Sequence, residues 1–428
     1  MRTLGTIGWR LVGQCLFIGA ALAAPAGLAS AQTIATATQN PGRTVDELLV
    51  LARQLNPELA ARALESDAAS AKVAGAGALE DPMLRVTSDE VDRTSGPRIN
   101  KMIYWVEQEI PLWGKLDLKR RIAEAEAAGV RGRERAATLE LEARVKTAFV
   151  QYYQASRSIE ITHDLHALLH TVSQAAQARY AQGQGNQADA IRAEVDRSRL
   201  DLDVVALERA RRTAQGRLNA LLARPPGSPL AAPSALQPLP PDGELRVTAL
   251  LDRARQENPA FATVSAEITA AEEERRLIDK SWYPNVTLGA AGITRANGPP
   301  GYMASIGLKV PLQWGVREAQ AREAAAKQGA AKSKLENAVL EIQAGLEEAA
   351  AGLEAARRME TLLATGLKPQ TEAGYRSALA AYQNGRGDLT AVLEAAHRLQ
   401  EVQLEILKVQ AEQRLLVADI ERAVGGEL

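Results

Sequence analysis

The feature that most constrains the fold is a strand-like segment that runs directly into a very long helix. The segment 101–110 alternates apolar and polar residues and ends at Pro111. Trp113-Gly114 then turns the chain into a stretch of polar residues and alanine that no proline interrupts from Lys115 to about Gln182. A helix of this length extends for about 100 Å. Such a helix is too long for a globular domain and is typical of coiled-coil-like arrays.

The second half of the chain repeats this unit. Residues 45–57 (VDELLVLARQLNP) align with residues 247–259 (VTALLDRARQENP) at an offset of 202. The strand-to-helix segment recurs as VPLQWG, in which Pro311 follows Pro111 by 200 residues. Four more positions keep the offset of 202: Pro82 and Pro284, Tyr180 and Tyr382, Gly183 and Gly385, Gly185 and Gly387. Matches spread over the whole unit indicate an internal duplication.

The same order of elements is expected in both repeats. A helical segment at 44–79, broken at Asn56-Pro57, precedes a hairpin with strands at 83–92 and 101–110. The long helix turns at 183–185 and returns at 187–223. In the second repeat we expect strands at 284–293 and 302–310 and helices at 316–383 and 389–424.

These elements predict a fold that is mainly α with a small β part. The first repeat spans 32–223 and contains the hairpin 82–111. A Pro-rich linker follows at 224–244, and the second repeat spans 245–428 with its hairpin at 284–311. Each repeat is a set of long coiled-coil-like helices that carries one β-hairpin.

The first residues read as a targeting segment. Arg2 and Arg10 make a basic start, residues 11–28 are apolar and small, and Ala29-Ser30-Ala31 has the form of a cleavage site. We therefore expect a signal peptide at 1–31, with an uncleaved membrane anchor as the alternative. The only cysteine, Cys15, lies in this segment, so the mature chain is expected to have no disulfide and no thiolate chemistry.

The four expected strands have the length that crosses a bilayer when the strands are tilted. Four strands cannot close a barrel, and open edges in lipid leave backbone groups unpaired. The pattern therefore predicts an oligomeric barrel in a bacterial outer membrane, surrounded by outer-membrane lipid. The charged helices would extend from it into the periplasm, so that barrel and helices form a conduit. The alternative is a periplasmic coiled-coil adaptor or scaffold protein without a pore.

The order of these motifs resembles the TolC family of outer-membrane efflux proteins. The resemblance covers about 44–424. It rests on the two NP-containing helix starts, the P-L-W-G segment that leads from strand to helix (the handover), and the tips at 178–194 and 380–395. It implies a homotrimer with a twelve-stranded transmembrane barrel continued by a periplasmic α-helical tunnel. It also implies two partners, a periplasmic adaptor (membrane fusion) protein and an inner-membrane pump of the RND type. The handover is most similar to that of the heavy-metal-cation branch, which handles cobalt-zinc-cadmium or copper-silver.

The resemblance further implies a periplasmic gate at the two helical tips. The candidate gate residues are Asp189 in the first tip and Tyr382, Arg386, Asp388 and Glu394 in the second. The structural alternative is that Tyr382 packs in the hairpin bend and that Asp189 and Asp388 cap the helices that follow. The family's paired acids in the second tip fall on Ala391 and Glu394, and its arginine falls on Gly387, so the gate chemistry is altered here.

Other kinds of site have little support in the sequence. His163, His166 and His170 have a spacing that places them on one helix face, which would suit a transition metal, but no fourth ligand is evident and a mid-helix histidine is usually a solvated or packed side chain. No Gly-rich phosphate loop, G-x-S-x-G or H-E-x-x-H motif is present, so we expect no enzyme activity and no cofactor. The net charge of −1 gives no reason to expect a nucleic acid partner.

Overall fold

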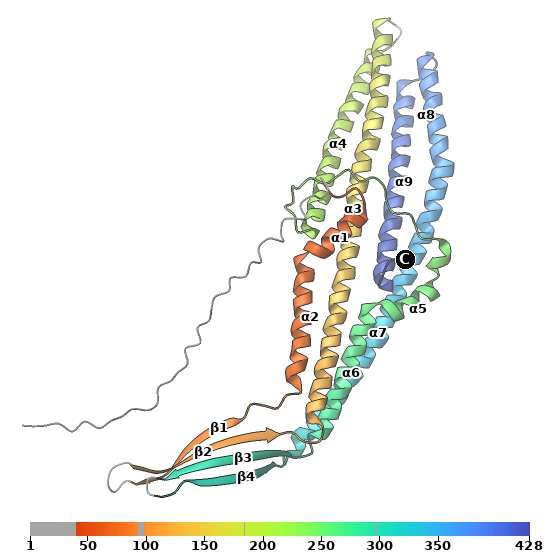
Figure 1. Ribbon diagram of the computed structural model, residues 1–428. Coiled ribbons are helices and arrows are strands. Elements are labelled where there is room, and N and C mark those ends of the chain that lie inside the picture. The colour runs from red at the N-terminus through yellow and green to blue at the C-terminus, as the bar shows by residue number, and fades with distance from the viewer. Residues whose placement is uncertain (1–39, 93–97, 184, 296–297) are drawn as a thin grey trace, which may run out of the picture. The chain divides into compact units, whose positions relative to one another are not determined.

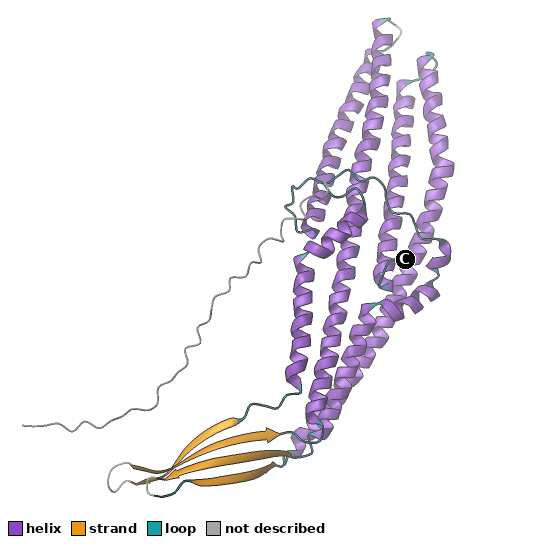
Figure 2. Cartoon of the chain, in the orientation of Figure 1, coloured by secondary structure: helices purple, strands orange, loops and turns teal. Residues whose placement is uncertain are grey.

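In the part of the chain that the structure describes, most residues are helical and four strands form one small sheet (Figures 1 and 2). The computed structural model describes residues 40–92, 98–183, 185–295 and 298–428, so the signal peptide expected at 1–31 lies outside the described residues. The main elements of the first repeat are α1 (Val45–Leu55), α2 (Pro57–Ala76), β1 (Met83–Asp92), β2 (Arg98–Ile110), α3 (Lys115–Ala181) and α4 (Gln187–Leu221). Those of the second are α5 (Val247–Glu257), α6 (Pro259–Lys280), β3 (Asn285–Arg295), β4 (Gly301–Lys309), α7 (Trp314–Thr361), α8 (Lys368–Gln383) and α9 (Leu389–Val424).

The break predicted at Asn56-Pro57 is present in both repeats and has the same chemistry in each. The Asn56 carboxamide oxygen accepts a hydrogen bond from the Glu58 amide, and Asn258 does the same for Ala260. Their Nδ2 groups donate to carbonyls at the ends of the returning helices, that of Leu221 at 2.9 Å and that of Ala423 at 2.7 Å. One asparagine in each repeat therefore caps a helix start and ties it to a helix end.

The two hairpins form a single antiparallel sheet with the order β1-β2-β3-β4. The central pair joins the repeats, because β2 of the first repeat pairs with β3 of the second over ten residues from Lys101↔Arg295 to Ile110↔Val286. The strand positions predicted from the sequence agree with the observed ones to within three residues. β1 and β4 are left as the two edges of the sheet.

The register places apolar residues from all four strands on one face. Leu84 lies opposite Val106, Val106 opposite Ala290, and Leu288 opposite Ile306. Leu84, Ile306 and Leu308 are more than 60% exposed in the single chain. The other face is mixed: it carries Ile103, Trp105, Ala291 and Ile293 beside the ion pairs Arg85–Glu107 at 3.0 Å and Lys309–Glu109 at 3.5 Å. The sheet thus has one face with exposed apolar side chains and one face that mixes apolar and charged side chains.

The long helix of the first repeat is continuous, whereas the prediction of one regular helix at 316–383 is wrong in detail. A π-helical segment, Leu362–Leu367, separates α7 from α8, and Pro369 is the second residue of α8. Proline has no N–H to donate and its ring clashes with the carbonyl four residues before it. A π-turn just before the proline accommodates this clash without ending the helix.

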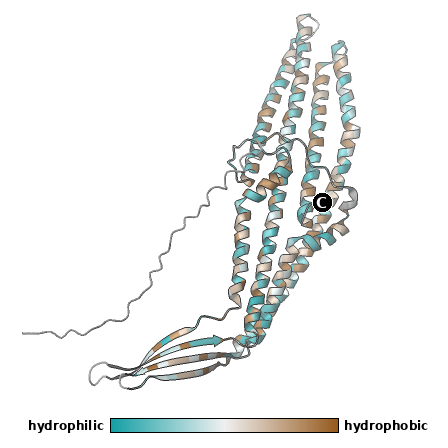
Figure 3. Cartoon of the chain, viewed as in Figure 1, coloured by the Kyte–Doolittle hydropathy of each residue, from teal (hydrophilic) through white to brown (hydrophobic). Residues whose placement is uncertain are grey.

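The helices bury three apolar clusters. One lies where α3, α4, α8 and α9 run together and includes Leu169, Leu200, Tyr382 and Leu389. The second gathers α1 with α3 and the end of α4, and the third gathers α5 with α7 and the end of α9. Figure 3 shows that hydrophilic residues are interspersed along all of these helices. None of the described helices is both long enough and apolar enough to cross a membrane.

The junction between strands and helices also connects the repeats. Trp113 has a φ of +66° and the following Gly114 a φ of +74°, which makes the tight turn into α3. The Trp113 ring lies 5.1 Å from that of Tyr283, and its Nε1 donates to the Pro284 carbonyl. The Lys115 Nζ donates to the Tyr283 carbonyl at 2.7 Å. The junction between β2 and α3 is therefore held against the start of β3.

Candidate channel gate at the helical tips

The two helical hairpins end in turns that glycine makes possible. Gly183 and Gly385 have φ values of +70° and +73°, and their amides donate to the carbonyls of Tyr180 and Tyr382. Positive φ is costly for most other residues. The turns predicted from the glycine pattern are confirmed at both tips.

The second tip is the tighter of the two. A Cβ at Gly387 would lie 2.9 Å from the Tyr382 amide nitrogen and 3.0 Å from Ala381. Only a residue without a side chain fits this approach. At the start of α4 it is Asn186 that caps the helix, because its Oδ1 accepts from the Ala188 amide, while Asp189 lies in the first turn. Asp388 occupies the corresponding position before α9 but makes no side-chain cap, so the capping role that we considered for both aspartates is wrong.

Two arginines of the first hairpin reach across to the second. The Arg179 Nη1, on α3, donates to the Tyr382 carbonyl at 2.6 Å, and the guanidinium carbon lies 4.8 Å from the centre of the Tyr382 ring. The Arg192 Nη1, on α4, donates to the Thr390 Oγ1 at 2.6 Å. Hydrogen bonds from charged donors are stronger than neutral ones, and the ring adds a cation–π contact. Together these two arginines clamp the hairpins of one chain to each other at their tips.

Tyr382 is the buried centre of this clamp, with 3% of its surface exposed. Burial raises the pKa of its phenol above the usual value, and the negative charges of Asp189 and Asp388 act in the same direction. The Arg179 guanidinium opposes them and lowers the pKa. Tyr382 therefore packs in the bend, as the structural alternative predicted, and also lies in the electrostatic field of both predicted tip acids.

The remaining predicted residues are more open. Asp189 is half-buried, while Arg386, Asp388 and Glu394 are exposed. Arg179 and Arg192 were not predicted, although they make the contacts between the hairpins. Their positions in the second repeat are occupied by Ala381 and Glu394. This difference in charge between the repeats at an offset of 202 distinguishes Arg179 and Arg192 in the sequence. The family pattern instead places the arginine of the tip at Gly387.

A groove of about 580 Å³ lies between α4 and α9 beside the Arg192–Thr390 bond. Its apolar walls include Ile191, Val195 and Leu393, and its charged lining residues are Arg192, Asp196, Arg199 and Glu394, with His397 beside them. The His397 Nε2 lies 3.7 Å from the Asp196 Oδ2. The groove combines apolar walls with charges of both signs, a composition found in protein–protein interfaces.

Two histidines of the candidate set, His166 and His170, lie beside residues of α4. The His166 Nε2 lies 3.4 Å from the Asp201 Oδ1, and the His170 Nδ1 lies 3.3 Å from the Arg197 Nη1. His163 is exposed on α3. Across the part of the chain that the structure describes, no three His, Cys, Asp or Glu side chains come together in a group that could hold a metal ion.

The family model described as outer membrane efflux protein matches residues 48–224 and, a second time, residues 250–426. The chain belongs to this family. The second match begins and ends 202 residues after the first, which is the offset found in the sequence. This outer membrane efflux protein is thus a TolC-family outer-membrane factor, and the prediction of the family is confirmed. No curated protein matches the sequence significantly.

Solved structures of outer-membrane channels share the fold of this efflux protein. The channel OprN aligns with a TM-score of 0.76 at 18% identity over 89% of this chain and 90% of that one. VceC from Vibrio cholerae gives 0.76 at 17% identity over 90% and 96%, and the open-state MtrE channel of Neisseria gonorrhoeae gives 0.76 at 19% identity over 90% and 90%. At these identities the likeness concerns the fold. The fold class is that of TolC-like channels, and the protein resides in the outer membrane with its helices in the periplasm.

Proposed function

We propose that this efflux protein forms a homotrimeric outer-membrane channel, a passive conduit through which small solutes leave the cell. A periplasmic adaptor and an inner-membrane pump of the RND type would deliver these solutes. One observation carries the proposal. The two repeats join inside the chain through the edge of the sheet and through the faces of the helices, and the equivalent edge and faces on the outer sides of the two repeats are exposed. Copies that join through these equivalent edges and faces form a ring.

The sheet supplies the first pair of such surfaces. Within the chain the second strand of one repeat, β2, pairs with the first strand of the next, β3. Repeating this step joins β4 of one copy to β1 of the next. The exposed face with Leu84, Ile306 and Leu308 would then face lipid, and open edges in lipid would be removed by closure. Twelve strands result if three copies close the ring.

The helices supply the second pair. Four apolar residues on α4 (Ile191, Val195, Leu202 and Val205) are 46–71% exposed. The residues 202 positions later on α9 include Leu393 and Leu407, which are 3% and 4% exposed because α9 packs in the bundle with α3. The α4 residues recur at 4, 7 and 3 positions, which is coiled-coil spacing. We propose that α7 and α8 of the neighbouring copy cover them, as α3 covers α9.

The gate follows from the tips. We propose that Arg179 and Tyr382, with the charges of Asp189, Asp388, Arg386 and Glu394 around them, hold the periplasmic end closed. The clamp acts within one chain. Arg179 and Arg192 correspond to Ala381 and Glu394 in the second repeat, so no arginine at these positions could make the same contacts with a neighbouring copy. The groove between α4 and α9 is part of the surface that the neighbouring copy would cover, since Ile191 and Val195 line it.

Heavy-metal cations are the solute class that we propose, on the similarity of the P-L-W-G handover to the metal branch. A strain that lacks this protein should become sensitive to zinc, copper or cobalt and regain resistance when the gene is restored. If the strain is sensitive to organic solutes only, those solutes replace metals as the proposed solute class, and the proposal of a channel is unchanged.

Cross-linking tests the ring of copies. The pairing of Gln108 with Leu288 in the chain, moved by one repeat, places Leu308 opposite Val86 of the neighbouring copy. The double variant Leu308→Cys with Val86→Cys should give covalent trimers in outer membranes with a short bis-maleimide reagent. The matched control Leu308→Cys with Thr87→Cys moves one thiol to the other face and should cross-link far less. Monomers in the first variant, together with no conductance in planar bilayers, would refute the channel and favour the scaffold protein.

A further inference from the structure

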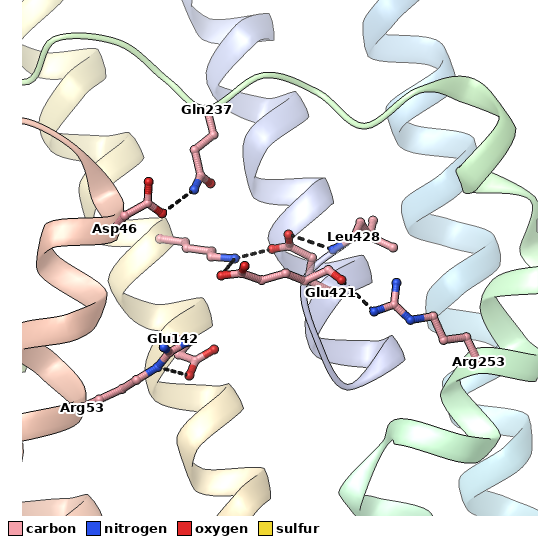
Figure 4. A network of polar contacts seen from close by, with 9 residues as sticks. Asp46, Arg53, Glu142, Gln237, Arg253, Glu421 and Leu428 are labelled. Atoms are coloured by element: carbon pink, nitrogen blue, oxygen red, sulfur yellow. Dashed lines mark hydrogen bonds and ion pairs between the residues drawn. The ribbon is translucent and has the colours of Figure 1, made fainter.

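The helix α7 leaves exposed a surface whose counterpart on α3 packs against α9. Within the chain the Lys146 Nζ of α3 lies 2.7 Å from the Glu421 Oε2 of α9, and the Gln400 Nε2 donates to the Thr162 Oγ1 at 3.2 Å. Figure 4 shows Glu421 where α9 faces α3. The residue numbers of these two contacts rise on α3 and fall on α9, so the helices are antiparallel and face each other along one row of residues.

The alignment of α7 with α3 fixes which residues of α7 correspond to this row. Four buried residues of each helix have the same spacing at an offset of 201: Val145, Ala148, Tyr152, Ala155 and Leu346, Ala349, Leu353, Ala356. At the tips the offset is 202, as Tyr180 and Tyr382 show. The extra residue falls where the π-helical segment Leu362–Leu367 lies, and a π-turn holds one residue more than an α-turn. An offset of 201 therefore applies to α7.

One pocket between α3 and α9 identifies a first pair of positions. Arg157 of α3 and Gln410 of α9 both line it. Their counterparts are Arg358 on α7, at the offset of 201, and Glu208 on α4, at the offset of 202. When α7 of one copy lies against α4 of the next as α3 lies against α9, Arg358 faces Glu208 of the neighbouring copy.

The adjacent turn supplies a second pair of positions. Val150 and Arg414 line the same cavity beside α3 and α9, and their counterparts are Ala351 and Arg212. Glu354 follows Ala351 by three residues and so lies on the same side of α7. Because the alanine side chain ends at Cβ, it leaves room for Arg212 of the neighbouring copy to reach Glu354.

The charges at these positions are complementary. On α7, Glu354 and Arg358 are four residues apart, form an ion pair with each other and are 66% and 75% exposed. On α4, Glu208 and Arg212 are also four residues apart, and Arg212 is exposed. Since the helices are antiparallel, an acid lies opposite an arginine at both positions. The residues at the same places between α3 and α9 include no acid: Tyr153, Arg157, Gln410 and Arg414.

We infer that Glu354 and Arg358 of one copy form ion pairs with Arg212 and Glu208 of the neighbouring copy, so that the partner of this surface of α7 is a second copy of the chain. The inference rests on the proposed ring of copies and adds the contact by which the helices recognise each other. Complementary charges at an interface fix the register and disfavour wrong partners more than they add affinity. The four charges therefore select α4 of the next copy as the partner of α7 and set the two helices in register.

The test measures the exchange of subunits between fluorescently labelled trimers of the full mature protein in detergent at low salt. Glu354→Arg and Arg212→Glu each place like charges across the boundary between copies. Each should make exchange about tenfold faster, because release of one copy breaks the contact at two boundaries. The double variant Glu354→Arg with Arg212→Glu restores opposite charges across the boundary. Its exchange rate should return to within about threefold of the wild type, although each helix then carries like charges four residues apart.

A matched control keeps the net charge of the double variant and moves one of its changes. Arg217 is exposed on α4, but it lies five residues from Arg212 and about 140° around the helix. Glu354→Arg with Arg217→Glu should therefore exchange as fast as Glu354→Arg alone. At about 1 M salt, which screens exposed charges, the exchange rates of the single variants should approach that of the wild type.

Cysteine cross-linking locates the contact independently of the stability of the trimer. Glu354→Cys with Arg212→Cys should give covalent dimers and trimers with a short bis-maleimide reagent. Glu354→Cys with Arg217→Cys should give far fewer, because its second thiol lies on another side of α4.

Three results would overturn the inference: single variants that exchange like the wild type, a double variant that stays fast, and a control that recovers as well as the double variant. If Leu308→Cys with Val86→Cys still gives covalent trimers in such a case, the proposed channel stands and only this contact is wrong. A wild type that forms no trimers would overturn both.

Discussion

Replacement of Arg179 by glutamine should open the periplasmic tip. Arg179 is half-buried and contributes a 2.6 Å hydrogen bond to the Tyr382 carbonyl and a cation–π contact at 4.8 Å. A hydrogen bond from a charged donor contributes about 1.5–3 kcal/mol, and a partly exposed cation–π contact about 0.5–1 kcal/mol. We therefore expect the closed state to lose about 2–4 kcal/mol in each chain. Because about 1.4 kcal/mol corresponds to a factor of ten, the ratio of open to closed tips should rise at least ~30-fold.

Single-channel conductance in planar bilayers measures this change. Tyr382→Phe should behave like the wild type, because phenylalanine keeps both the ring and the backbone carbonyl that Arg179 contacts. Tyr382→Leu keeps only the carbonyl and should fall between the wild type and Arg179→Gln. Arg398→Gln removes a charge from an exposed position of α9 outside the proposed gate and controls for net charge. A folded Arg179→Gln channel with wild-type conductance would refute the clamp, and an open Tyr382→Phe channel would assign the closure to the phenol hydroxyl instead.

Three further predictions concern the tips and the helix starts. Gly387→Ala should raise channel conductance more than Gly183→Ala. The new Cβ at residue 387 would lie 2.9 Å from the Tyr382 nitrogen, whereas a Cβ at residue 183 meets no atom within 4 Å and adds only the strain of a positive φ. Equal effects of the two variants on conductance would contradict the close approach at Gly387. Asn258→Ala should destabilise the protein by about 1 kcal/mol through loss of the helix cap and by about 1–3 kcal/mol more because the Ala423 carbonyl loses its hydrogen-bond donor. Thermal unfolding followed by circular dichroism measures this loss, and Asn56→Ala is the equivalent variant in the first repeat. An unchanged melting curve would contradict the prediction. The pKa of Tyr382 is raised in the folded protein, so the stability that its neutral phenol contributes is complete below about pH 10 and is lost as the pH rises through the folded pKa. Burial also raises the pKa values of Tyr152 and Tyr375, so phenolate absorbance should show one late-titrating tyrosine fewer in Tyr382→Phe than in the wild type; an unchanged number would exclude the assignment to Tyr382.

Local chemistry made much of the fold predictable from the sequence. Strands alternate with a period of two, prolines end or break elements, and glycines mark turns with positive φ, so the hairpins, the long helices and both tips were placed within a few residues. The duplication was visible for the same reason, since both copies need the same residues at the same turns. The family followed from the order of these local signals.

Contacts between distant residues could not be predicted in this way. Nothing local in the sequence specifies that β2 pairs with β3 or that Arg179 reaches Tyr382 across 203 positions. The π-turn before Pro369 also escaped, because a proline in a helical pattern can end the helix, kink it or be accommodated by the neighbouring turn. The sequence by itself determined which elements form and where each one turns, because those choices depend on the preferences of neighbouring residues. Only the tertiary structure decided which side chains meet, because packing brings together residues that the chain keeps hundreds of positions apart.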